Sequence, residues 1–251
     1  MSDSLGNGGA GDAGFTLSGA HWPEVEAGPR RLLVVPVGSL EQHGAHLPLE
    51  TDTRIAAAVA GRACAGRSGV GLAPPFAIGA SGEHADFPGT LSIGSVALST
   101  LLVELGRHAS LHWPAMLLVN GHGGNVTAIR DAVRQLRREG RRSHVWHAGL
   151  RPGMLATEDG VAPDAHAGRV ETSMMLALAP DDVRLDAAAA GDTRPLAEIL
   201  SDLGAHGVRQ VSPNGVLGDP AGASAAEGEQ LLSLLVVNLT QTVDGLLASM
   251  Q

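Results

Sequence analysis

The sequence contains no lysine and no tyrosine, so all 17 of its basic residues are arginines. Without lysine, the chain cannot form a Schiff base with a carbonyl substrate or with pyridoxal phosphate, and it has no P-loop lysine. Without tyrosine, it has no phenol that could serve as an acid. Acid–base chemistry is therefore left to histidine, aspartate and glutamate.

Cysteine, positive charge and long apolar runs are scarce as well. Cys64 is the only cysteine, which excludes an internal disulfide, and its alanine-rich surroundings favour a buried structural thiol over a catalytic one. The formal net charge of -9 argues against nucleic acid and anionic membranes as partners. No unbroken apolar run reaches ~18 residues and no export signal is apparent, so we expect a cytoplasmic protein without a membrane partner.

The remaining composition is that of a globular protein, with 44% hydrophobic and 17% charged residues in 251. Residues 1–14 are rich in glycine, serine, aspartate and alanine and are predicted to be disordered, whereas residues 15–251 are predicted to form a single domain. Apolar patterns predict strands at 32–39, 71–75, 115–119 and 143–147, and helices at 51–61, 95–112, 126–138, 170–178 and 229–249. This alternation indicates an α/β fold whose mostly parallel sheet is covered by helices on both faces.

The loop after the first predicted strand carries a dense set of polar side chains. Glu41, His43, His46 and Asp52 follow that strand, at the strand end where α/β folds bind ligands. Carboxylate and imidazole groups without thiolate suit catalytic Zn²⁺, Mn²⁺ or Fe²⁺. Each residue alone is more often a surface group, and Asp52 alone is a better helix cap. Four such residues in one loop favour a metal site.

Two further segments carry candidate groups. A glycine-rich turn holding His122 follows the strand at 115–119, and it lets the backbone approach a ligand closely. Such a turn could instead hold phosphate, but it lacks lysine and a GxGxxG pattern, so metal is favoured. His166 and Glu171 stand at the start of another predicted helix, where helix-end preferences alone would also explain them.

These segments together resemble the creatininase (creatinine amidohydrolase) family of metal-dependent hydrolases, which act on cyclic amides, formamides and peptides. The matching motifs are Glu41-x-His43-Gly-x-His46-Leu-Pro-x-x-x-Asp52, the Gly-Glu-His-Ala-Asp-Phe-Pro-Gly-Thr run at 82–90, Asn120-Gly-His122-Gly-Gly-Asn125, His166-Ala-Gly-x-x-Glu171-Thr-Ser, and Gly215-Val-Leu-Gly218-Asp-Pro220.

The resemblance implies a three-layer α/β/α sandwich and a homo-oligomer, often a hexamer. It implies two divalent ions (Zn, Fe or Mn), one held by Glu41, Asp52 and His122, the other by His43, Asp52 and Glu171. Asp52 would bridge them, and His166 would carry a proton.

Two departures from the family pattern weaken creatinine as the substrate. Gly124 stands where the creatinine-hydrolysing enzyme has a glutamate ligand, so Glu171 must supply that carboxylate. Arg169 replaces the first glutamate of the His-Ala-Gly-Glu run.

Three functional hypotheses follow. Within the family, overall likeness is greatest to a peptidase that releases a C-terminal dipeptide from a modified precursor peptide. The alternatives are a small-molecule amidohydrolase acting on a creatinine-like or formamide-type substrate, and a non-catalytic metal-binding scaffold subunit.

The roles of several other residues stay open at this point. Glu83 and His84 could line a substrate pocket, although His84 could equally stabilise its own loop. His46 is expected to orient a metal ligand. Trp146 and Phe87 are favoured as core residues over substrate contacts.

Overall fold

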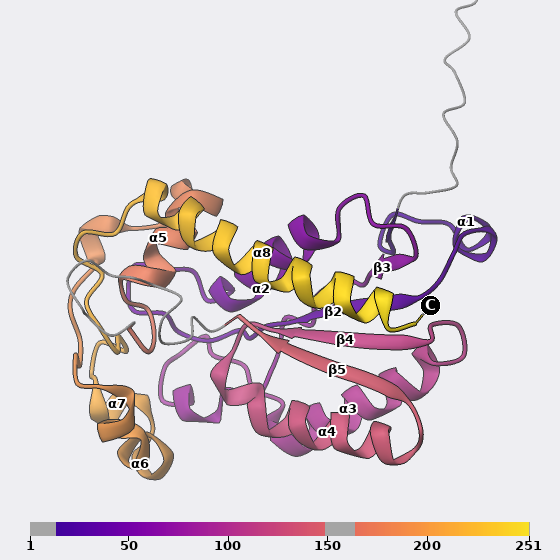
Figure 1. Ribbon diagram of the computed structural model, residues 1–251. Coiled ribbons are helices and arrows are strands. Elements are labelled where there is room, and N and C mark those ends of the chain that lie inside the picture. The colour runs from indigo at the N-terminus through magenta and orange to yellow at the C-terminus, as the bar shows by residue number, and fades with distance from the viewer. Residues whose placement is uncertain (1–13, 149–163, 251) are drawn as a thin grey trace, which may run out of the picture.

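A sheet of five parallel strands forms the centre of the molecule (Figure 1), in the order β1-β3-β2-β4-β5. The computed structural model describes residues 14–148 and 164–250. The strands are β1 (Phe15–Thr16), β2 (Leu32–Val37), β3 (Val70–Leu72), β4 (Ala115–Asn120) and β5 (Arg142–His147). Every residue of β2 and β4 is buried, as expected for central strands of a parallel sheet.

Helices cover both faces of this sheet. On one face lie α2 (Thr51–Cys64), α5 (Arg169–Leu178) and α8 (Ala225–Ala248), and on the other lie α3 (Gly94–Ala109) and α4 (Val126–Arg138). Alternate strand residues serve the two layers: Val34 packs with the first and Val35 with the second. The predicted α/β/α sandwich is confirmed.

The remaining elements are short and lie at the two ends of the sheet. They are α1 (Trp22–Ala27), α6 (Leu196–His206), α7 (Val208–Val211) and 3₁₀ turns at Gly82–His84, Gly123–Asn125, Pro180–Asp182 and Leu185–Ala187. Figure 1 shows α6 and α7 together, beyond the carboxyl ends of β4 and β5. They therefore stand beside the edge of the sheet at which α/β folds bind ligands.

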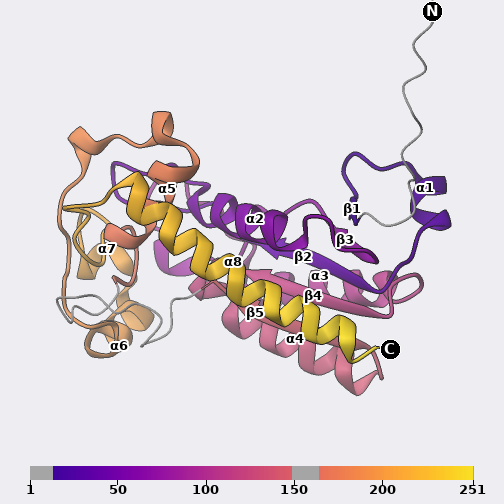
Figure 2. The same cartoon turned by 45° about the horizontal axis from the view of Figure 1, so that its top comes forward.

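The C-terminal helix α8 is long and apolar enough to cross a membrane by length and composition. Figure 2 shows it running across the sheet from α5 toward the C-terminus. Its leucines at 231, 232, 235 and 239 are buried against α5 and α2. One side of α8 therefore belongs to the core on this face of the sheet, whereas Leu234 and Val237 are exposed.

The predicted elements match the observed ones with shifts at their ends. The last helix begins at Ala225 and not at 229, because Ser224 caps it: its Oγ accepts a hydrogen bond from the backbone N–H of Glu227, 3.2 Å away. Strand β1 and helices α1, α6 and α7 were not predicted.

Cys64 is buried, which raises the pKa of its thiol to about 12 and confirms the structural role. The segment predicted to be disordered lies, apart from Gly14, outside the described residues.

Candidate metal centre

The polar loops that follow β2 and β4 meet at the carboxyl edge of the sheet. Glu41 and His43 follow β2, Asp52 stands in the first turn of α2, and His122 follows β4. Helix α5 adds Glu171 from its own first turn. Parallel strands end at the same edge, so residues far apart in sequence share one site.

Two groups of side chains that share Asp52 have the spacing of metal ligands, and a third group, Glu41, His43 and His166, has it as well. In Glu41, Asp52 and His122, and again in His43, Asp52 and Glu171, one ligand atom from each residue lies within 4.8 Å of the others. Asp52 belongs to both groups: its Oδ1 lies 3.2 Å from His43 Nε2, and its Oδ2 lies 3.1 Å from His122 Nδ1. The five residues that the sequence analysis singled out therefore come together.

The carboxylate of Glu41 points to a cation. Its side chain is fully buried, yet neither of its oxygens accepts a hydrogen bond from the described residues. The Nε2 atom of His122 lies 3.1 Å from Oε2, and that of His84 lies 3.4 Å from Oε1. A buried carboxylate without hydrogen bonds is costly unless a cation compensates its charge, so the donor set fits a bound metal ion.

The electrostatics of the cluster agree with this interpretation. Burial disfavours the imidazolium of His43, but the Asp52 carboxylate outweighs it and raises the pKa of His43 to about 10. Against the same burial, Glu41 and Asp52 raise the pKa of His122 well above its usual value. Burial raises the pKa of Glu171 to about 7. His43, His122 and Glu171 thus tend to keep their protons in the metal-free protein, and a metal cation could replace these protons.

Other polar groups orient the candidate ligands. The hydroxyl of Ser39 donates to Asp52 Oδ2 over 2.7 Å. The Nδ1 atom of His43 lies 3.1 Å from the Glu41 carbonyl oxygen, so Nδ1–H can donate there and Nε2 stays directed at Asp52. The Ala167 N–H donates to Glu171 Oε2 over 2.6 Å.

His46 connects the first loop to α5. Its Nε2 lies 2.9 Å from the hydroxyl oxygen of Thr172, the neighbour of Glu171. The ring is buried and belongs to neither ligand group. The expected orienting role of His46 is therefore supported by its position.

Gly124, which stands where the family pattern has a glutamate, leaves room for the carboxylate of Glu83. A Cβ atom at this position would lie 2.3 Å from the Ala80 carbonyl oxygen, 2.4 Å from Glu83 Oε1 and 2.5 Å from His122 Nε2. Glu83 itself lies 3.4 Å from His122 Nε2. A side chain at position 124 would therefore displace the Ala80 backbone together with Glu83 and His122.

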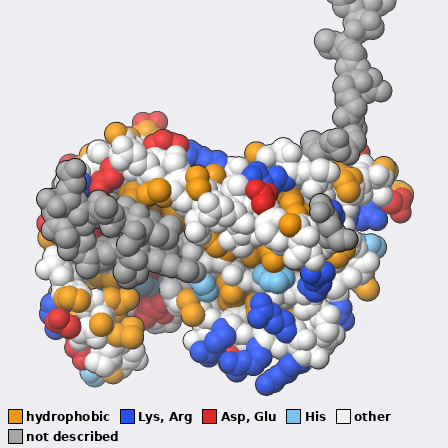
Figure 3. Space-filling view, viewed as in Figure 1, with side chains coloured by type: hydrophobic (Ala, Val, Ile, Leu, Met, Phe, Trp, Pro, Cys, Tyr) orange, Lys and Arg blue, Asp and Glu red, His pale blue; other side chains and the backbone are white. Residues whose placement is uncertain are grey.

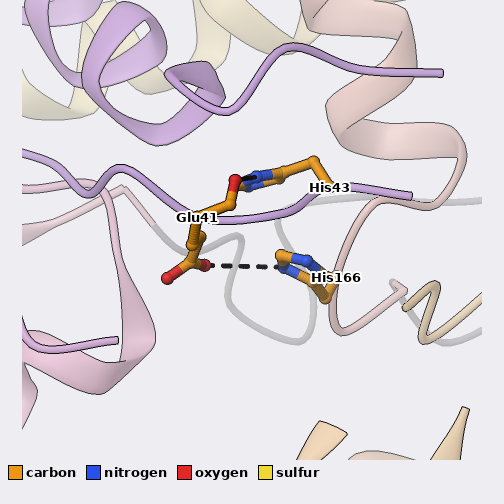
Figure 4. A group of neighbouring side chains, drawn as sticks. All are labelled: Glu41, His43 and His166. Atoms are coloured by element: carbon orange, nitrogen blue, oxygen red, sulfur yellow. Dashed lines mark hydrogen bonds and ion pairs between the residues drawn. The ribbon is translucent and has the colours of Figure 1, made fainter. Parts of the chain in front are cut away.

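His166 lies beside the cluster, together with Glu41 and His43 (Figure 4). Its Nε2 is 2.8 Å from the Gln42 carbonyl oxygen and its Nδ1 is 3.9 Å from Glu41 Oε1. Burial, and then the positive charges of His43 and His84, hold the pKa of His166 well below its usual range. The ring is neutral at pH 7, with Nδ1 on the side of Glu41.

Gln42 is the residue that the sequence analysis missed. Its side-chain nitrogen lies 2.9 Å from His84 Nδ1, 3.1 Å from His166 Nε2 and 3.0 Å from the Gly215 carbonyl oxygen. Gln42 therefore positions two imidazoles at once, because its side-chain N–H can donate to His84 Nδ1 and its carbonyl oxygen can accept from His166 Nε2–H. Its place between two candidate ligands, directly after a buried strand, was the available signal.

The cluster opens into a cavity of about 570 Å³. Its polar wall includes Glu83 and His84 as well as the candidate ligands. Its apolar wall comes chiefly from α6, through Leu196, Leu200 and Leu203. Trp146 is buried in the core and its indole N–H donates to Asn238, while Phe87 packs on a small cluster around Ile199. Neither aromatic residue lines this cavity, so the preference for core roles is confirmed.

Comparisons with known proteins agree with this site. The family model for creatininase (creatinine amidohydrolase) matches residues 18–243. A mycofactocin precursor peptide peptidase from Mycolicibacterium smegmatis is 52% identical over 211 residues, which cover 82% of this chain and 81% of that protein. The creatinine amidohydrolase of Pseudomonas putida is 31% identical over 248 residues, covering 88% and 93%. A solved manganese creatininase is similar with a TM-score of 0.71 and 27% identity, over 92% of this chain and 97% of that one. The chain therefore belongs to the creatininase family and is a metal-dependent amide hydrolase.

Proposed function

We propose that this enzyme is a metallopeptidase that releases a C-terminal dipeptide from the modified mycofactocin precursor peptide. One contrast carries the proposal: identity is 52% with the mycobacterial precursor peptide peptidase but 31% with the creatinine amidohydrolase. The replacement of a family glutamate by Gly124 also argues against creatinine as the substrate.

In this proposal Glu41, Asp52 and His122 hold one divalent ion, and His43, Asp52 and Glu171 hold a second. Their spacing and the unbonded oxygens of Glu41 support the assignment. Two ions bound there would lower the pKa of a water molecule and polarise the substrate carbonyl. Zinc, iron and manganese all accept this set of nitrogen and oxygen ligands.

His166 is proposed to move the proton. Hydrolysis forms a bond between water oxygen and the carbonyl carbon, breaks the carbon–nitrogen bond, and requires a proton on the leaving nitrogen. The neutral His166 ring can accept, at its Nδ1 atom, the proton that the water loses. It can then deliver this proton to the leaving nitrogen of the substrate. Gln42 would hold the ring in place because its backbone carbonyl oxygen accepts a hydrogen bond from His166 Nε2–H.

The test is mass spectrometry of the modified precursor peptide after incubation with the metal-loaded enzyme. We expect a released dipeptide and a remaining peptide shorter by two residues, with no reaction for an Asp52→Ala variant. An unchanged peptide, together with turnover of creatinine or a formamide, would favour the small-molecule amidohydrolase instead. Metal binding without turnover of any of these compounds would favour the scaffold hypothesis.

We also propose that the enzyme forms a homo-oligomer, for which the family resemblance implies a hexamer, and that it works in the cytoplasm. Apolar side chains exposed on α8, Leu234 and Val237, are compatible with subunit contacts. Sedimentation analysis of the purified protein measures the subunit number, and cell fractionation measures the location.

A further inference from the structure

A second cavity, of about 620 Å³, lies between α4 and β5. Its lining combines four arginines with three valines and one histidine. These are Arg130, Arg134, Arg137, Arg138, Val126, Val133, Val145 and His147. We call this cavity the arginine groove. A cationic groove stands out on a chain whose formal charge is -9.

The four arginines form one stripe along α4. Their spacing of four, three and one residues puts them on adjoining turns of one helix side. Figure 3 shows basic side chains gathered on the lower part of the molecule, where Figure 1 places α4. Like charges at such spacing repel one another, which favours an anionic partner in the groove.

Arg130 pairs with the carboxylate of its neighbour Asp131 over 3.3 Å, but the charges of the other three arginines are not neutralised by the described residues. Arg134 and Arg138 are exposed, and neither has a carboxylate partner among residues 14–148 and 164–250. Arg137 donates to the Ser143 carbonyl, a neutral group. The nearby carboxylate of Glu139 already accepts hydrogen bonds from Arg107, Arg141 and Gln135.

The groove also has features that a solvated charged surface lacks. Val133 and Val145 add apolar surface between the arginines. Strand β5 is an edge strand, with β4 as its neighbour in the described sheet. The Ala148 N–H bonds to the Asn120 carbonyl of β4, so by alternation the backbone groups of Val145 face the open edge. An extended peptide can pair with such an edge and place alternate side chains on the valines and the arginines.

The groove leads toward the candidate metal centre. Val126 lines the groove at the start of α4, and its neighbour Thr127 lines the cavity of the metal centre. An extended chain that leaves the groove at Val126 can therefore enter the catalytic cavity.

We propose that the arginine groove binds an acidic stretch of the peptide substrate on the amino-terminal side of the cleaved bond. This inference rests on the proposed function. If a dipeptide is released, only two residues lie beyond the cleaved bond, and they cannot reach along α4, which is roughly 20 Å long at 1.5 Å per residue. The groove must therefore receive the other side of the substrate.

The test compares two fluorescein-labelled versions of the modified precursor peptide that end in the same residues. One carries several glutamates upstream, and in the other these are glutamines. We expect the wild-type enzyme to bind the acidic peptide about fivefold to tenfold more tightly, as measured by fluorescence anisotropy, with the difference shrinking as salt is raised. The double variant Arg134→Gln/Arg138→Gln is expected to lose this preference while keeping its metal content.

The matched control is Arg62→Gln/Arg67→Gln, which removes the same charge from α2 and the loop after it. This control is expected to keep the preference. Equal binding of both peptides by the wild type, or an unchanged preference in Arg134→Gln/Arg138→Gln, would overturn the groove proposal. A changed subunit number of that variant in sedimentation would also overturn it, because the groove would then be an interface between copies.

Binding and cleavage are measured separately, so the two proposals fail in different ways. Preference for the acidic peptide without cleavage of either peptide overturns the peptidase assignment and leaves the groove as a binding site. Cleavage of both peptides, with equal affinity, overturns the groove alone.

Discussion

Asp52 is the residue on which both ligand groups of the centre depend. It lies within 3.2 Å of His43 and 3.1 Å of His122. We expect Asp52→Ala to reduce the bound metal and to lower activity by more than the roughly 10–100-fold that loss of an outer partner costs. Metal analysis by mass spectrometry and a rate assay measure this, with the exposed Asp186→Asn as control. Full activity without bound metal would refute the dinuclear mechanism.

Metal analysis and a rate assay also distinguish a proton-transfer role of His166 from a metal-binding role. If its role is proton transfer, His166→Gln lowers kcat by about 10²–10⁴-fold and leaves the metal content unchanged. If it binds metal with Glu41 and His43, with which it also forms a close group, the metal content falls as well. The exposed His108→Gln is the control, and a variant with normal kcat would exclude both roles.

At the scale of elements, the approach of β4 to α2 determines where His122 meets Asp52. A Cβ atom on Gly121 would lie 2.6 Å from the Asp52 carbonyl oxygen. We expect Gly121→Ala to lower the free energy of unfolding by about 1–3 kcal/mol in urea denaturation, and to weaken metal binding. Gly123→Ala is the control, because a Cβ there meets no atom within 4 Å. Equal stability of the two variants would contradict the argument.

Helix α6 forms the apolar wall of the catalytic cavity. Leu200 is 61% exposed and lines the cavity, while its neighbour Ile199 is fully buried and anchors the helix. We expect Leu200→Ala to raise KM for the peptide roughly 3–10-fold, with metal content unchanged. Leu234→Ala, exposed on α8, should leave KM as it is. If both variants have the wild-type KM, α6 does not contact the substrate.

For the whole molecule, the centre links stability to pH. In the metal-free protein the pKa of His43 is raised to about 10, so its stabilising contribution is present below its ordinary value of 6.5 and is lost as pH rises through 10. Glu171, with a pKa raised to about 7, changes in the same direction: its contribution is lost as pH rises through 7. We expect urea denaturation to show the metal-free protein losing stability between pH 4.5 and 10, first through Glu171 and then through His43.

We expect the stabilisation that bound metal provides to depend on pH in the opposite direction. Ligand imidazoles must be neutral, so metal binding near pH 7 releases protons and its apparent affinity rises with pH. Calorimetric titration in two buffers of different ionisation enthalpy measures the released protons. Identical heats in the two buffers would show that His43 and His122 are already neutral in the metal-free protein.

Local sequence was sufficient for the main elements of the fold. The buried runs at β2 and β4 predict central strands, and the helix at 126–138 was predicted with the bounds that α4 has. Short elements such as α6 and α7 escaped prediction. Helix α6 keeps large apolar residues exposed toward the cavity, so its pattern does not report a core-facing side.

The sequence by itself determined the chemistry of this protein. Lysine and tyrosine are absent, and Glu41, His43, Asp52 and His122 follow buried strands, so a metal centre was predictable from residue type and position. Tertiary structure decided what surrounds the centre: Glu171 meets His43 across 128 residues of sequence, Gln42 holds His84 and His166, and α6 closes the cavity. The physical reason is that such contacts depend on how α5 and α6 pack onto the sheet edge, which no local pattern encodes.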